Sequence, residues 1–113
     1  MSDENQIYLP DSFLALYRDA RQRLTAPLAD IRARYELCED LAQQLEEHAR
    51  GRSIHAHGSE VDLLLRYHAG LADPESGFSA AEARWVVTRL SELLGWECPH
   101  LPEEEGKDTP PAA

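Results

Sequence analysis

Residues 27–50 read PLADIRARYELCEDLAQQLEEHAR, and this stretch decides the fold class. Its apolar residues recur at alternating three- and four-residue steps, which places them on one side of an α-helix. They are Leu28, Ile31, Tyr35, Cys38, Ala42, Leu45 and Ala49. The opposite side is charged, as expected of a face in contact with solvent. Thr25 as N-cap and Pro27 in the first turn indicate where the helix starts. The pattern therefore predicts one long helix from Pro27 to Arg50.

The order of charges along this predicted helix opposes the helix dipole. Arg32 and Arg34 lie in its early half, and most of its acidic residues lie later. Cations near the start and anions near the end are unfavourable. Two interpretations remain open. Arginines on neighbouring helices neutralise the acidic half, or the acidic half is a docking face for a basic partner. The candidate arginines are Arg66, Arg84 and Arg89.

Two shorter helices are predicted before and after the long one. Asp11 is a suitable N-cap for a first helix from Ser12 to about Arg23. Ser59 is a suitable N-cap for a third helix, and Gly70 followed by an apolar residue resembles a Schellman stop.

The fourth predicted helix has the clearest local signature in the chain. Ser79 and Glu82 have the spacing of a capping box, in which each side chain bonds the backbone N–H of the other residue. The helix runs from Ala80 to about Leu94, and Gly95 is the expected left-handed stop.

No stretch shows the two-residue alternation of a strand, so the fold class is all-α. We expect a small four-helix bundle with one long central helix and disordered termini. Residues 1–10 are predicted to be a flexible N-terminal segment and residues 11–96 a single helical domain. Residues 97–113 are rich in proline and glutamate and are predicted to be a disordered acidic tail.

Composition limits the class of partner. The 113 residues include 21 acidic and 11 basic side chains, which gives a formal net charge of −10. Such a chain is repelled by nucleic-acid phosphate and by anionic lipid. No apolar run approaches the roughly 20 residues that span a bilayer. The first residues lack the basic and apolar regions of a secretory signal, so we expect a cytoplasmic protein.

The sequence contains no recognisable catalytic motif. The phosphate-binding string G-x-x-x-x-G-K-[ST] is absent, which excludes nucleotide hydrolysis by a P-loop mechanism. Cys38 lies on the apolar stripe and is predicted to be a small buried residue. His48 and His68 are predicted to be hydrogen-bonded, partly buried side chains rather than catalytic bases. We therefore predict neither an enzyme nor a cofactor.

Four residues outside the helices have side chains of the type that bind zinc: His55, His57, Cys98 and His100. The two pairs are too closely spaced for an ordinary zinc finger, and solvated loop histidines are the expected alternative. A small metal-binding or redox protein that uses these residues is the second functional hypothesis.

Aromatic residues outnumber what four short helices can easily bury. Such residues at the edge of an apolar stripe are enriched in interfaces, although they also occur as ordinary core-edge residues. We predict Tyr8, Tyr17, Trp85 and Trp96 as contacts for a protein partner.

Three stretches together resemble a family of small uncharacterised proteobacterial proteins of the Burkholderia and Bordetella type. The stretches are Ser2–Tyr17 without Asp11 and Leu14, Ala33–Ala42, and Leu90–Trp96. Members of that family often carry the label "ATPase with chaperone activity". The resemblance implies a bacterial cytoplasmic protein of unsettled function, and it supplies no catalytic residues. Because the phosphate-binding loop is absent, the ATPase label does not carry over, and the resemblance hints only at an association with a chaperone or unfoldase machine.

The first functional hypothesis is therefore a non-enzymatic module or adaptor for protein–protein interaction. The long apolar stripe suits a monomeric bundle and a homodimer equally well.

Overall fold

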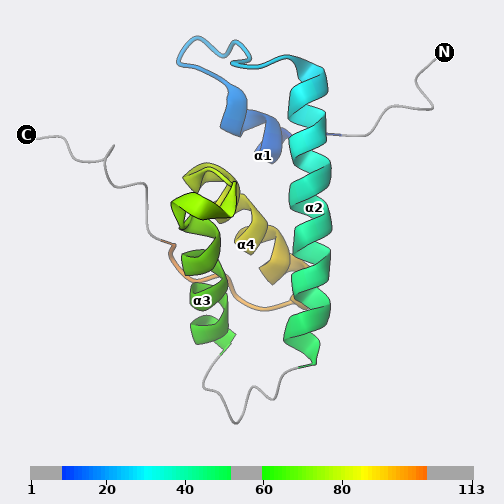
Figure 1. Cartoon of the computed structure of the whole chain (residues 1–113), viewed down its shortest axis with the longest axis vertical. Helices are drawn as coiled ribbons and strands as arrows, with labels where there is room; N and C mark the ends of the chain where they lie inside the picture. The colour runs from blue at the N-terminus through cyan, green and yellow to red at the C-terminus, as the bar shows by residue number, and fades with distance from the viewer. Residues whose placement is uncertain (1–8, 52–59, 102–113) are drawn as a thin grey trace, which may run out of the picture.

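The computed structural model describes residues 9–51 and 60–101, and every regular element in these two ranges is helical (Figure 1). The elements are α1 (Asp11–Leu14), η2 (Ala15–Tyr17), α2 (Leu28–Arg50), α3 (Glu60–Ala72), η4 (Pro74–Ser76) and α4 (Ala80–Leu94). The predicted all-α bundle with one long helix is confirmed. None of the described helices is long and apolar enough to cross a membrane.

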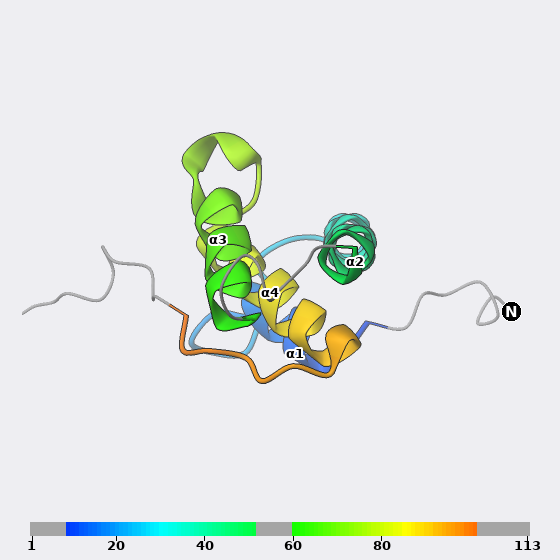
Figure 2. The ribbon, with the colours of Figure 1, turned by 90° about the horizontal axis from the view of Figure 1, so that it is seen from below.

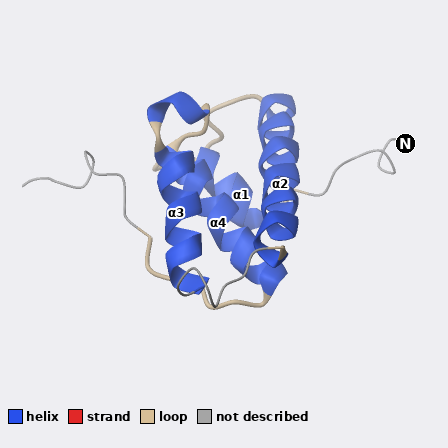
Figure 3. Ribbon diagram, turned by 60° about the horizontal axis from the view of Figure 1, so that its bottom comes forward, coloured by secondary structure: helices blue, strands red, loops and turns tan. Residues whose placement is uncertain are grey.

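Helix α4 lies at the centre of the arrangement. Figures 2 and 3 both place it between α2 and α3, and these two helices pack mainly on α4. Eight residues of α4 are buried: Glu82, Ala83, Trp85, Val86, Val87, Leu90, Ser91 and Leu94. Helix α2 is longer but buries only Ile31, Cys38, Ala42 and Ala49. The long helix therefore leaves much of its surface open, and α4 supplies the shared core.

Both ends of α4 match their sequence signals. The Ser79 hydroxyl accepts a hydrogen bond from the Glu82 N–H, and the Glu82 carboxylate accepts one from the Ser79 N–H, which completes the capping box. At the other end Gly95 has φ of 75°, and the N–H of Trp96 bonds the carbonyl of Ser91. This is the Schellman geometry that the glycine predicted.

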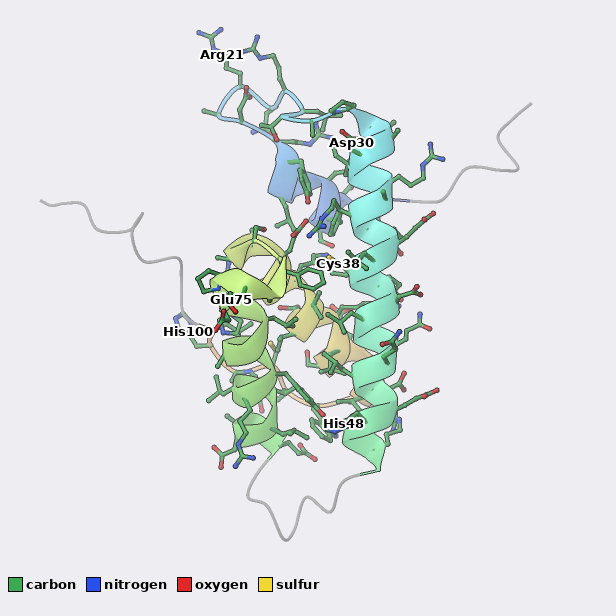
Figure 4. All side chains as sticks on the ribbon, viewed as in Figure 1. Arg21, Asp30, Cys38, His48, Glu75 and His100 are labelled. Atoms are coloured by element: carbon green, nitrogen blue, oxygen red, sulfur yellow. The ribbon has the colours of Figure 1, made fainter. Side chains whose placement is uncertain are left out.

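The first helix is shorter than predicted: α1 ends at Leu14, and the 3-10 turn η2 continues the coil only to Tyr17 rather than to near Arg23. Asp19 explains the early end. Its carboxylate accepts hydrogen bonds from the N–H groups of Arg21 and Arg23, at 2.8 and 2.9 Å. Side-chain bonds of this kind compete with helical backbone bonds. The segment instead forms a loop, with Arg21 projecting away from the helices (Figure 4).

The predicted cap of α2 is also corrected. The N-cap is Pro27, which has no side-chain bond to the helix. The Thr25 hydroxyl donates instead to the carbonyl of Tyr17, at 3.1 Å, and the Thr25 N–H bonds the same oxygen. Thr25 therefore closes the preceding loop rather than capping the helix.

Helix α3 continues two residues beyond the stop predicted at Gly70 and ends at Ala72. Asp73 then adopts an extended conformation before Pro74. A residue that precedes proline avoids the helical region, so the proline rather than the glycine ends the helix. The predicted cap Ser59 lies outside the described residues.

The described chain continues past α4 into the predicted tail. Leu101 is only 4% exposed and packs in one core cluster with Leu64 of α3 and Leu90 of α4. The second core cluster surrounds Phe13, Ile31 and Trp85 at the other end of the bundle. Residues 97–101 thus help to cover the helices.

Candidate functional site

A polar network joins η2, α2 and α4 around the buried carboxylate of Glu82. This side chain is part of the capping box and also accepts two hydrogen bonds from Arg34, Nε to Oε2 at 2.9 Å and Nη2 to Oε1 at 2.7 Å. The hydroxyl of Tyr17 donates to Oε2. Arg34 in turn donates to the carbonyl of Gly77 at 2.8 Å and lies over the ring of Phe78.

The electrostatics of this network indicate a structural role. Burial raises the pKa of Glu82, but the bonds from Arg34, Tyr17 and Ser79 outweigh it and hold that pKa below its usual value. Burial and the neighbouring Glu82 raise the pKa of Tyr17 well above its usual value. A carboxylate held ionised and a phenol held neutral do not exchange protons near pH 7. The network therefore stabilises the fold and does not resemble an acid–base site.

Beside this network, aromatic rings pack edge to face. Phe13 lies 5.1 Å from Trp85 and 5.5 Å from Tyr35, between ring centroids. The indole N–H of Trp85 donates to the hydroxyl of Ser12 at 2.9 Å. Trp85 is only 9% exposed, so this predicted contact residue belongs to the core. The sequence pattern predicts that Trp85 lies at the edge of the α4 stripe. It cannot show that the ring of Phe13, which comes from a distant segment of the chain, covers this position.

Of the other three predicted contact residues, the two that the structure describes, Tyr17 and Trp96, do not form a common surface. Tyr17 is half-buried, and its hydroxyl is engaged by Glu82. Trp96 is half-buried against the core cluster at the opposite end of the bundle. Tyr8 lies outside the described residues.

Two acidic residues in the later half of α2 are paired with arginines, but only Glu39 is paired with an arginine of a neighbouring helix, as one of the two interpretations of the charge order predicted. Glu39 accepts two bonds from Arg89 of α4, at 2.9 and 3.1 Å, and these bonds lower the pKa of Glu39. Glu46 pairs with Arg50 at 2.9 Å. Arg50 also donates to the carbonyl of Leu93 near the end of α4, at 3.0 Å.

The remaining acidic residues of this half point outward. Glu36, Asp40 and Glu47 are exposed, and no hydrogen bond or ion pair to another described residue engages their carboxylates. Their spacing of four and seven residues places them in one row on the helix. Leu37 lies beside the row and is 47% exposed. Gln44 helps to line a shallow hollow between Asp40 and Glu47. We call these five residues the α2 outer face.

The sequence pattern assigned Leu37 to the flank of the apolar stripe. The structure leaves it at an open edge, because the described helices pack on α2 mainly through α4. In the sequence, Leu37 lies about 100° around the helix from the centre of the apolar stripe, and this position is the signal that could have identified its exposure.

A pocket of about 220 Å³ lies between α4 and the segment formed by α1 and η2. Its lining residues are Ser12, Leu16, Ala81, Arg84, Trp85, Thr88, Arg89 and Glu92. This volume is below the roughly 300–1,000 Å³ of small-molecule sites. Arg89 is already paired with Glu39, and Ser12 is bonded to Trp85. The pocket offers no nucleophile paired with a base.

The helical cysteine and histidines have the structural roles that the sequence predicted in most respects. Cys38 is fully buried, and burial, together with the charge of Glu82, raises its pKa to about 12. It is therefore a thiol and not a nucleophilic thiolate. His68 is 6% exposed, and burial, together with the charge of Arg84, lowers its pKa. His48 is exposed rather than buried, and its Nδ1 is hydrogen-bonded to a tyrosine of α3.

The four zinc-ligand candidates are only partly described. The sulfur of Cys98 lies 3.9 Å from the hydroxyl of Thr88, and His100 is exposed beside α3 (Figure 4). His55 and His57 lie outside the described residues. Within residues 9–51 and 60–101, no group of three or more His, Cys, Asp or Glu side chains is placed to hold a metal ion. The metal hypothesis stays a prediction.

Comparison of the chain with models of protein families, with curated proteins and with solved structures gives no match.

Proposed function

We propose that this protein is a non-enzymatic interaction module that binds a basic segment of a protein partner through the α2 outer face. One observation carries the proposal. On the same helix, Glu39 and Glu46 are paired, whereas the row of acidic residues around the half-exposed Leu37 has no cationic partner among the described residues. A face that combines uncompensated charge with an exposed aliphatic side chain favours a partner of opposite charge that also offers apolar contact.

The expected partner segment carries lysine or arginine side chains spaced to meet the acidic row and one apolar side chain to cover Leu37. Such charge pairs at an exposed surface accelerate association and weaken as salt is added. Nucleic acid and anionic lipid are repelled by the same charges. The resemblance to the family labelled for chaperone activity supports a cytoplasmic bacterial protein whose partner belongs to a chaperone machine.

The test compares two charge-reversal variants of the whole chain. The first replaces the acidic row by lysine (Glu36→Lys, Asp40→Lys and Glu47→Lys). The matched control replaces three exposed acidic residues outside α2 (Glu60→Lys, Glu75→Lys and Glu97→Lys). Both variants change the net charge by the same amount, so a general charge effect acts on both. Thermal unfolding followed by circular dichroism checks that each variant keeps the fold.

Each protein is immobilised and exposed to a bacterial lysate at low and at moderate salt, and captured proteins are identified by mass spectrometry. We expect a protein that the wild type and the control capture at low salt, that is released by salt, and that the first variant does not capture. Equal capture by the two variants would contradict the assignment to the α2 outer face. The single substitution Leu37→Ala in the wild-type chain is expected to weaken capture without changing its salt dependence, because this substitution removes only apolar contact.

A further inference from the structure

Helix α3 has a second apolar side that the described bundle leaves exposed. Its inner side packs on α4 through Leu63, Leu64 and His68. Next to that side, steps of four, four and three residues join Val61, Leu65, Ala69 and Ala72 on one face of the helix. All four residues are exposed, and Val61 and Leu65 are exposed by 40% and 37%. We call these four residues the α3 apolar face.

The described parts of the chain do not bury this face. Within residues 9–51 and 60–101, α3 packs mainly on α4 and η4. The C-terminal segment inserts Leu101 beside Leu63 and Leu64, in a core cluster that includes neither Val61 nor Leu65. Residues 102–113 are acidic and proline-rich in sequence, which does not suit an apolar surface. Exposed apolar side chains that form one contiguous patch indicate an interaction site, unlike apolar residues that are scattered singly over a surface.

We propose that the α3 apolar face binds the same face of a second copy of this chain, with the two α3 helices antiparallel about a two-fold axis near Leu65. In this register Leu65 contacts the partner's Leu65. Four residues away on either side, Val61 contacts the partner's Ala69, so a large side chain faces a small one. A two-fold interface requires such self-complementarity, because the same patch serves both subunits.

The charges at the edge of the face select this orientation. Asp62 and Arg66 lie on the same edge, one helical turn apart. In an antiparallel pair the edges meet with their directions reversed, so Asp62 approaches the partner's Arg66, and Arg66 approaches the partner's Asp62. In a parallel pair the same edges lie on opposite sides of the two-fold axis, so Asp62 and Arg66 would not meet their counterparts and these ion pairs would be lost. Exposed ion pairs contribute little energy, but they decide between alternative orientations of helices.

The size of the contact predicts a weak dimer. Helix α3 has 13 residues, so it is roughly 20 Å long. A contact through one such helix falls below the roughly 1,200 Å² of a standard stable interface. We therefore expect reversible association that becomes visible only at high protein concentration.

Analytical ultracentrifugation of the full chain tests the proposal, from about 10 μM to about 1 mM protein at about 0.15 M salt, where charge repulsion between acidic subunits is screened. The wild type is expected to shift from the 12.7 kDa monomer towards a dimer. Leu65→Glu places two carboxylates together at the two-fold axis and is expected to remain monomeric throughout. Leu28→Glu is the control, because Leu28 is also an exposed leucine, at 50%, but lies on α2 outside both proposed faces. It is expected to associate like the wild type.

A cross-linking experiment gives a second readout that does not depend on affinity alone. Leu65→Cys in a Cys98→Ser background is expected to form a covalent dimer under mild oxidation, and Leu28→Cys in the same background is not. A monomeric wild type at about 1 mM would overturn the proposal, as would equal association of the two glutamate variants. Equal cross-linking of the two cysteine variants would also overturn it.

Discussion

Replacement of Glu82 by glutamine is expected to destabilise this fold by about 2 kcal/mol, although the two side chains have nearly the same shape. The carboxylate of Glu82 accepts two bonds from Arg34, one from Tyr17 and one from the N–H of Ser79. An amide offers one acceptor oxygen, and its NH₂ group faces donors at the other position. The variant therefore loses charge-assisted bonds and places donors against donors.

The magnitude follows from the exposure of the two partners. Breaking a fully buried ion pair costs about 3–5 kcal/mol, because the remaining charge stays without a partner. Here the Glu82 side chain is 4% exposed, but the Arg34 side chain is 34% exposed. The guanidinium can therefore regain water when its partner is lost, which reduces the cost to about 2 kcal/mol. A loss of this size corresponds to a fall in Tm of roughly 8–16 °C for a domain of this length.

Urea unfolding at pH 7 measures the effect, and Glu39→Gln is the matched control. Glu39 also accepts two bonds from an arginine whose side chain is 34% exposed, but Glu39 itself is more exposed, at 15%. Its only other recorded donor among the described residues is Gln43. We expect a loss of about 1 kcal/mol for this control, about half the effect at Glu82.

The pH dependence provides an independent check. The pKa of Glu82 is lower in the folded state than its ordinary value of 4.5. Its contribution to stability is therefore fully present above about pH 4.5 and is lost as the pH falls through the folded-state pKa. Glu82→Gln should lack this part of the acid sensitivity. Equal losses at pH 7 for the two glutamine variants, or an unchanged acid profile for Glu82→Gln, would show that the bonds to Glu82 do not stabilise the fold in this way.

Two further predictions concern the end of the described chain and the buried histidine. Leu101→Ala is expected to lower the free energy of unfolding by about 2 kcal/mol, because a buried leucine is truncated. A loss below about 0.5 kcal/mol in urea unfolding would show that residues 97–101 do not contribute to the core. For His68, burial and the charge of Arg84 hold the folded-state pKa below 6.5. The unfolded chain therefore binds a proton first as the pH falls, and stability should decline below about pH 6.5. His68→Gln should flatten the stability profile between about pH 7 and 5, and an unaltered slope would contradict this assignment.

Local patterns in the sequence were sufficient for the type and approximate bounds of the long helices. The predicted start of α2 lies within one residue of the observed start, and the capping box and Gly95 define α4 as expected. These signals depend on side chains within a few residues of the bonds that they form. The first helix was predicted to be too long because the apolar period outweighed Asp19, whose side-chain bonds end the helix at Tyr17.

Composition and local periodicity were enough to predict an acidic all-α chain without a P-loop, since both can be read from residues that are neighbours in the chain. Which acidic residues of the described chain remain without a cation depends on how the helices pack, because Glu39 and Arg89 are 50 positions apart in the chain. The same reason applies to Arg34 and Glu82, which are 48 positions apart, and to Trp85, which Phe13 covers from a distant segment. Hydrogen bonds and burial between such residues depend on how the helices pack, and helical periodicity carries no information about the partner across the interface.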